Sequence, residues 1–117
     1  MNRGTAEFRR SRIEVLEFLS NPIQQRAFAG ATEYDDYASE FLSWWFDDFY
    51  PESAMFQAAF TAAEIGALGK LTQALEDVDA KLGTRKHTVD ELIATPEWHQ
   101  VGIAASGALA ALGVGAT

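Results

Sequence analysis

Residues 33–52 read EYDDYASEFLSWWFDDFYPE and hold eight aromatic side chains and seven carboxylates, with no lysine or arginine. At about 100° per residue, the aromatic and apolar side chains between Tyr34 and Phe49 fall mainly on one broad face of a helix. The opposite face carries polar side chains: Asp36, Glu40, Ser43 and Asp47. This pattern predicts an amphipathic helix that buries its aromatic face. Pro51 is expected to end the helix, because proline disfavours helical backbone in the residue before it.

Two aspartates near the end of this segment are unusual for a core helix. Asp48 falls inside the apolar arc, between Trp44 and Phe41. Asp47 and Asp48 both lie in the last turn, where the helix dipole disfavours each negative charge by roughly 0.3–1 kcal/mol. One interpretation is that Asp48 lies at the edge of the core and is bonded to an indole N–H or a backbone amide, as buried polar groups usually are. The other is that the acids and aromatics form a surface for a partner. Aromatics are common at the centre of interfaces whereas carboxylates are usually depleted there, so this combination indicates a partner with a strong positive charge.

The whole chain has the size and composition of one folded domain. Its 117 residues are 48% hydrophobic, and a chain of this length buries about two-thirds of its unfolded surface. No cysteine is present, so disulfides and cysteine-ligated metals are excluded. Residues 1–12 lack the apolar core of a signal peptide, and we expect a cytoplasmic location. Residues 101–117 are uncharged but shorter than the ~20 apolar residues of a membrane span, so they predict a core helix.

The net charge of -8 is unevenly distributed along the chain. Residues 1–26 carry five arginines and three glutamates, whereas residues 27–69 carry eight acids and no base. Residues 70–117 carry four bases and six acids, so the middle segment alone matches the whole net charge. Such a field attracts cationic surfaces and repels nucleic acid and anionic lipid. We therefore expect a basic protein partner, and neither a nucleic-acid nor a membrane partner.

Start and stop signals predict further helices on both sides of the aromatic segment. The capping-box sequences Thr61-Ala-Ala-Glu64 and Thr88-Val-Asp-Glu91 each begin a helix, and Gly83 ends the first of them. The other predicted helices cover about residues 5–20, 23–28 and 95–112, with a loop that opens at Gly30 and a short helix or turn at 52–60. No period-two pattern is long enough for a strand. The expected fold is all-α: one compact domain of about five to six helices, with a core at 33–112 and an N-terminal helical region at 1–32.

Two of the predicted helices contain glycines and other small residues, which we expect at places where another part of the chain packs closely. Gly66 and Gly69 each cost about 1 kcal/mol relative to alanine within a helix. We expect them to allow the close approach of a bulky side chain, either Trp44 or Trp45. In the last helix, three small residues are expected to allow tight contact with a neighbouring helix: Gly102, Ser106 and Gly107.

The sequence lacks the motifs of common catalytic sites. It contains no glycine-rich phosphate loop, no G-x-S-x-G elbow and no H-E-x-x-H pair. The doublets Asp35-Asp36 and Asp47-Asp48 suggest a divalent cation, which prefers clustered carboxylates. Neighbouring residues point about 100° apart on a helix, however, and roughly three turns separate the doublets, so no shared ion is expected. We expect no catalytic residue, cofactor or metal ion, and interpret the chain as a binding protein rather than an enzyme.

Aromatic and capping residues recur in four motifs along the chain. They are FLSWWFDDFYP at 41–51, Phe60-Thr61-x-x-Glu64-x-x-x-Leu68, Thr88-Val-x-Glu91-Leu92-Ile93 and Pro96-x-Trp98-x-x-Val101. Together these motifs resemble the small helical immunity proteins of bacterial contact-dependent inhibition and related toxin systems. The resemblance covers about residues 40–112 and leaves the N-terminal third unmatched.

The resemblance implies a protein that binds and blocks a cognate toxin domain, often a nuclease, made by the same cell. The charge pattern agrees with that role, because a nuclease presents a basic groove to phosphate and an acidic face can cover such a groove. On this hypothesis, carboxylates and aromatic anchors form the partner-binding surface: Asp35, Asp36, Glu40, Trp44, Asp47, Asp48, Tyr50 and Glu52. Further aromatics contribute wherever they are exposed: Tyr34, Tyr37 and Phe46.

Two other functions stay open from the sequence. An acidic binding module, such as a nucleic-acid mimic or a helical adaptor, would use the same face on a partner that is not a toxin. A small metal-dependent enzyme would instead use the aspartate doublets. The binding roles require that the carboxylates share a surface and that the arginines near the start of the chain do not neutralise them.

Overall fold

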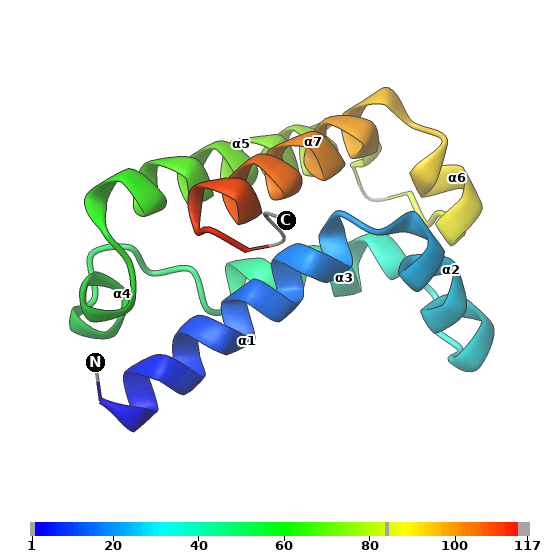
Figure 1. Ribbon diagram of the computed structural model, residues 1–117. Coiled ribbons are helices and arrows are strands. Elements are labelled where there is room, and N and C mark those ends of the chain that lie inside the picture. Colours follow the sequence, from blue (N-terminus) through cyan, green and yellow to red (C-terminus); the bar gives the residue numbers. More distant parts are fainter. Residues whose placement is uncertain (1, 84, 115–117) are drawn as a thin grey trace.

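Seven helices make up the part of the chain that the structure, a computed structural model, describes: residues 2–83 and 85–114 (Figure 1). They are α1 (Arg3–Leu19), α2 (Pro22–Ala31), α3 (Tyr37–Phe46), α4 (Ala54–Ala59), α5 (Ala62–Leu82), α6 (Val89–Ile93) and α7 (Pro96–Ala111). No strand occurs in these ranges, which confirms the all-α class. The number of helices exceeds the expected five to six, because the segment predicted as a helix or turn forms α4. None of the described helices is both long and apolar enough to cross a membrane.

Each of these seven helices begins at a polar side chain that accepts a backbone N–H hydrogen bond from the first turn. The capping residues are Asn2, Asn21, Asp36, Ser53, Thr61, Thr88 and Thr95. Both predicted capping boxes are confirmed, because the glutamate of each box also accepts the N–H of its threonine. Gly83 follows α5 with a φ of 60°, a backbone conformation that glycine adopts without a steric penalty. Local hydrogen bonds therefore determine where the helices begin.

α3 packs its aromatic face against the rest of the bundle, and its opposite face is open to solvent. α5 and α7 lie side by side and run in opposite directions, and α1 packs against α7 (Figure 1). α4 lies near the N-terminus of α1, whereas α2 and α6 pack together at the other end of the molecule. α3 contacts α1, α5 and α6, so its aromatic face meets helices from both halves of the chain.

The aromatic face of α3 forms the centre of the core, as predicted. Phe41 and Trp45 are fully buried, and the Trp45 indole N–H donates a hydrogen bond to Thr72 Oγ1 of α5 at 2.9 Å. The centroid of the Phe41 ring lies 5.0 Å from that of Phe18 and 5.9 Å from that of Trp98. Such aromatic pairs contribute about 0.5–1.5 kcal/mol beyond the burial of their area. One ring of α3 therefore joins α1 and α7 in the core.

α3 is shorter at both ends than the sequence predicts. The Asp36 carboxylate accepts the N–H of Ser39, which starts the helix after Asp36 and leaves Tyr34 outside it. At the other end, the Asp48 N–H bonds to the Trp45 carbonyl, three residues earlier, at 3.2 Å. The chain has therefore left the helix before the proline that was expected to end it.

The expected close approaches at helix glycines are wrong. A Cβ added at Gly66 or Gly69 would meet no atom within 4 Å, so neither tryptophan packs there. Both glycines lie on the exposed side of α5. The same result holds at Gly102 and Gly107 of α7, so tight packing of that helix does not depend on the missing side chains. Gly30 lies within α2 and does not open a loop.

Gln25 of α2 is a fully buried polar residue that links three helices. Its side-chain amide group donates hydrogen bonds to the carbonyls of Phe18 and Leu19, at the end of α1, at 2.8 and 3.2 Å. Its Oε1 accepts the indole N–H of Trp98 of α7 at 2.9 Å. The amide thus bonds to three polar groups in the core, one of which, the Phe18 carbonyl, also accepts the Asn21 N–H at 3.2 Å.

We expect Gln25→Met to lower the free energy of unfolding by about 1–3 kcal/mol or more, because buried polar groups lose their partners. The matched control is Gln24→Met, which changes the exposed neighbour and should stay within about 0.5 kcal/mol of wild type. Urea unfolding followed by tryptophan fluorescence measures both. Equal losses in the two variants would contradict the role of Gln25.

A second long-range polar contact joins α1 to the start of α5. The Arg9 guanidinium donates to both carboxylate oxygens of Glu64, at 2.9 and 3.0 Å, and to the Ala59 carbonyl at 2.8 Å. These hydrogen bonds from Arg9, together with the Thr61 N–H, hold the pKa of Glu64 below its ordinary value. Glu64 therefore serves both the capping box of α5 and its attachment to α1.

The lowered pKa of Glu64 predicts how stability depends on pH. A carboxyl with a lower pKa in the folded chain stabilises the fold above its unfolded pKa, and this contribution is lost as pH falls through the folded pKa. We expect Glu64→Gln to be destabilised near pH 7, and its difference from wild type to shrink as pH falls below about 4.3. Urea unfolding at stepped pH measures the difference, with the exposed Glu17→Gln as control. A gap that stays constant down to about pH 2 would argue against this linkage.

Candidate functional site

The carboxylates of the predicted partner-binding surface lie along α3 and on its flanking segments. Three belong to α3 and its two caps: Asp36, Glu40 and Asp47. The other three lie before or after the helix: Asp35, Asp48 and Glu52. The two capping residues are about 16 Å apart along the helix axis, given the rise per residue. The acidic groups therefore form an extended row and do not converge on one point.

Arg12 of α1 pairs with one of these carboxylates. Its side chain is only 7% exposed, and it donates to the Asp48 carboxylate at 3.2 Å and to the Trp44 carbonyl at 2.9 Å. The guanidinium carbon also lies 5.7 Å from the centroid of the Trp45 ring. Burial lowers the pKa of Arg12 and the Asp48 charge opposes that shift, while an arginine stays protonated in either case. Asp48 is therefore a satisfied polar group, but its partner is an arginine and not an indole or a backbone amide.

Among the residues that the structure describes, one other carboxylate of the predicted set has a cationic partner. Lys86 Nζ lies 3.4 Å from Asp35 Oδ2, and both side chains are largely exposed. Exposed pairs of this kind contribute about 0–1 kcal/mol, so a stronger cationic partner can replace Lys86. Within the described residues, the remaining members form no ion pair: Asp36, Glu40, Asp47 and Glu52. These four carboxylates keep their negative charge available at the surface.

The two predicted aromatic anchors differ in their surroundings. The Trp44 ring packs edge-on against Phe18 and Phe28, with centroid distances of 5.1 and 5.0 Å, and is half-buried. Tyr50 lies beyond the end of α3 with 63% of its surface exposed. Tyr34 is also exposed, although its ring stacks on Phe28. Trp44 therefore serves mainly the core, and the tyrosines present the accessible rings.

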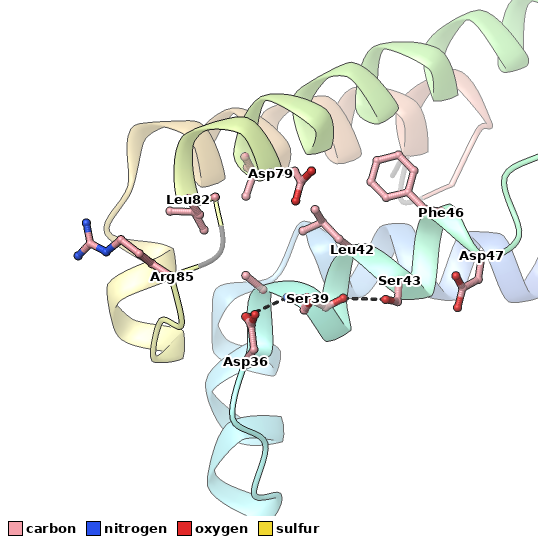
Figure 2. Close-up of a pocket in the computed structure, with 12 residues that line it drawn as sticks. Asp36, Ser39, Leu42, Ser43, Phe46, Asp47, Asp79, Leu82 and Arg85 are labelled. Carbon is pink, nitrogen blue, oxygen red and sulfur yellow. Dashed lines mark hydrogen bonds between the residues drawn. The ribbon is translucent and has the colours of Figure 1, made fainter.

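A groove runs between α3 and the C-terminal half of α5 (Figure 2). Leu42 and Phe46 point from α3 toward α5, and Leu82 points back from α5, so the floor is apolar. The carboxylate of Asp79 points from α5 into the space above α3, and Arg85 extends outward at the far end of the groove. The groove encloses about 230 Å³, less than the 300–1,000 Å³ of typical small-molecule sites. Its size suits one or two side chains of a protein partner.

Asp79 is the site residue that sequence reasoning missed. It lies in the last turn of α5, next to the buried Val78, and helical periodicity marks it only as one of several exposed acids on that helix. Asp79 lies more than thirty residues after the end of α3 in the chain, and its position opposite that helix results from the packing of α5 against α3. No local pattern in the sequence carries that information.

The carboxylates do not form a metal centre in the described part of the chain. Across residues 2–83 and 85–114, no group of three or more histidine, aspartate and glutamate side chains is arranged to hold a metal ion. Asp36 and Asp47 lie at opposite ends of α3, so the two aspartate doublets do not share a coordination site. What the arrangement offers is an extended negative surface.

Comparisons with known proteins give no direct guide to this site. No protein-family model, no curated protein and no solved structure matches the chain. The functional assignment therefore rests on the charges, the exposed side chains and the groove along α3.

The neighbouring aspartates at the end of α3 should respond differently to charge reversal. Asp48→Lys places a second cation beside the buried Arg12, and we expect it to lower the free energy of unfolding by about 1 kcal/mol or more. Asp47→Lys places a cation at a helix C-terminus, where it is favoured, and should be neutral or slightly stabilising. Urea unfolding of the two variants measures this difference. Equal effects would show that the Arg12 contact does not matter for stability.

Proposed function

We propose that this protein is an immunity protein, which binds a cognate bacterial toxin domain through the acidic side of α3 and thereby neutralises it. The observation that carries the proposal is the row of carboxylates that have no ion pair among the described residues: Asp36, Glu40, Asp47 and Glu52. The N-terminal arginines could have neutralised this row, yet among the carboxylates of the described residues Arg12 pairs with Asp48 alone and Arg9 with Glu64 alone. The row therefore projects a negative field that attracts a cationic protein surface.

A nuclease toxin is the partner class that this surface suits best. Such an enzyme must hold phosphate groups in a basic groove, and a row of carboxylates can occupy or cover the same groove. The field would accelerate encounter, and the exposed rings of Tyr34 and Tyr50 would supply apolar contact at the interface. No catalytic group of this chain is needed for such inhibition, since blocking access to the substrate is sufficient.

The motif resemblance supports the immunity role in particular. Phe41 and Trp45 of the first motif lie in the core, and Thr61 and Thr88 cap helices. The matched positions are therefore core and capping residues, and the acidic row supplies a separate argument for binding. The two lines of support are independent, because no carboxylate of the unpaired row packs in the core.

Co-expression with the product of the gene immediately upstream tests the proposal. We expect that product to stop growth when it is expressed alone, and this chain to restore growth and to co-purify with it as a stable complex. Toxicity that persists in the presence of the folded chain would contradict the immunity role. A non-toxic neighbour that still forms a complex would favour an acidic binding module with another partner.

Charge reversal on α3 should affect the rate of complex formation with the upstream product. We expect Glu40→Lys with Asp47→Lys to slow association by roughly tenfold at low salt and to flatten its dependence on salt, because the steering field is lost. The matched control is Glu76→Lys with Asp77→Lys, which makes the same charge change on the exposed side of α5. Stopped-flow measurements at low and high salt compare the variants. Equal slowing by both pairs would mean that net charge, and not the α3 surface, controls binding.

A further inference from the structure

We infer that the groove between α3 and α5 is the docking site for a cationic amphipathic segment of the protein partner, whose lysine or arginine residues lie beside Asp47 at one end and beside Asp79 nearer the other. The inference rests on the proposed binding of a cationic protein and adds where, and by which kind of segment, that partner is held. The groove combines an apolar floor with unpaired carboxylates along its edge.

The floor of the groove offers a small apolar surface, mainly at Phe46, because Val78 is fully buried and Leu42 and Leu82 are nearly so. Leu42, Val78 and Leu82 form its buried base, and the half-buried Phe46 leaves part of its ring open to the groove. A hydrated ion or a purely polar segment would leave this apolar surface in contact with water. A side chain with an apolar stem, such as leucine or the methylene chain of lysine, would remove it from water.

The charges around the groove indicate where the basic residues of the segment lie. Asp47 caps the C-terminus of α3, where the backbone carbonyls add negative potential, and Asp79 lies in the last turn of α5. Within the described residues neither carboxylate forms an ion pair. Arg85 lines the opposite end, beside Asp36 (Figure 2). Asp79 lies over the half of α3 nearer Arg85, whereas Asp47 lies at the far end (Figure 2). The segment therefore carries basic residues spaced along the groove, one beside Asp47 and one beside Asp79.

The dimensions of the groove fit a short protein segment. α3 spans about 16 Å between its two capping residues, which equals about three turns of a partner helix or about five residues of extended chain. The enclosed volume of about 230 Å³ leaves room for one or two inserted side chains. A helix that presents one apolar residue flanked by lysines meets both requirements, in the manner of helix-in-groove recognition.

A peptide titration tests the inference on the full chain. The probe is a helical peptide of about 15 residues with leucines on one face and lysines on both flanks, and its counterpart carries glutamate at every lysine position. We expect the lysine peptide to shift the amide NMR signals of Leu42, Phe46 and Asp79 as it binds. The glutamate peptide should leave those signals unchanged.

Two matched variants locate the charges that matter. Asp47→Asn with Asp79→Asn should raise the Kd of the lysine peptide by roughly tenfold, because the charges beside two of its bound lysines are removed. Glu76→Gln with Asp77→Asn removes the same charge from exposed positions of α5 outside the groove and should change the Kd by less than about twofold. Both substitutions keep the shape of the side chain, and neither pair takes part in an ion pair with another described residue.

Three results would overturn the inference: no signal shift at about millimolar peptide, shifts confined to other helices, or equal weakening by the two variant pairs. Shifts of the groove signals that depend only on protein concentration would assign the groove to a second copy of the chain and would also overturn it. Because the peptide has no toxic activity, this titration can fail while growth is restored in the co-expression experiment. If the peptide binds in the groove but the toxicity persists on co-expression, the docking site is supported and the immunity role is contradicted.

Discussion

The orientation of α3 depends on the hydrogen bonds that the buried guanidinium of Arg12 makes with the end of that helix. The guanidinium ties α1 to the end of α3 through the Trp44 carbonyl and the Asp48 carboxylate, and it lies against the Trp45 ring. Burying an arginine is costly unless its N–H groups are bonded, so the contact tolerates few alternative positions of the two helices. It holds the aromatic side of α3 inward, and the row of carboxylates on its other side consequently faces solvent. The same contact explains why Asp48, though it belongs to the acidic stretch, serves the fold.

The acids of the middle segment thus divide into two groups. Asp35, Asp48 and Glu64 pair with cations from other parts of the chain, and two of these pairs link α1 to the rest of the bundle. The carboxylates of this segment without an ion pair among the described residues lie on α3 and its flanks, and two of them, Asp36 and Asp47, border the groove between α3 and α5. Residues 33–52 and Glu64 therefore supply both kinds of carboxylate. Some form ion pairs that stabilise the fold, and others remain available to a partner. A count of acidic residues could not separate these groups.

Features that depend on nearby residues could be predicted from the sequence, and features that depend on packing could not. The capping boxes at Thr61 and Thr88 were predictable because each needs only a residue three positions away. The burial of Phe41 and Trp45 was predictable from helical periodicity. The ends of α3 were missed because a side-chain cap and a tighter final turn act before the proline does. The linking role of Gln25 and the position of Asp79 beside α3 arise from contacts between distant segments, which leave no local pattern.

Carboxylate labelling in the complex tests the central claim most directly, namely that the unpaired acids of α3 face the partner. The chain would be treated with a carbodiimide and an amine, alone and bound to the product of the upstream gene, and labelling at each carboxylate would be read by mass spectrometry. Protection of Glu40, Asp47 and Asp79, with unchanged labelling of Glu76 and Asp77, is the predicted result. Protection of Glu76 and Asp77 with full labelling along α3 would contradict the claim and would place the partner on another face of the bundle.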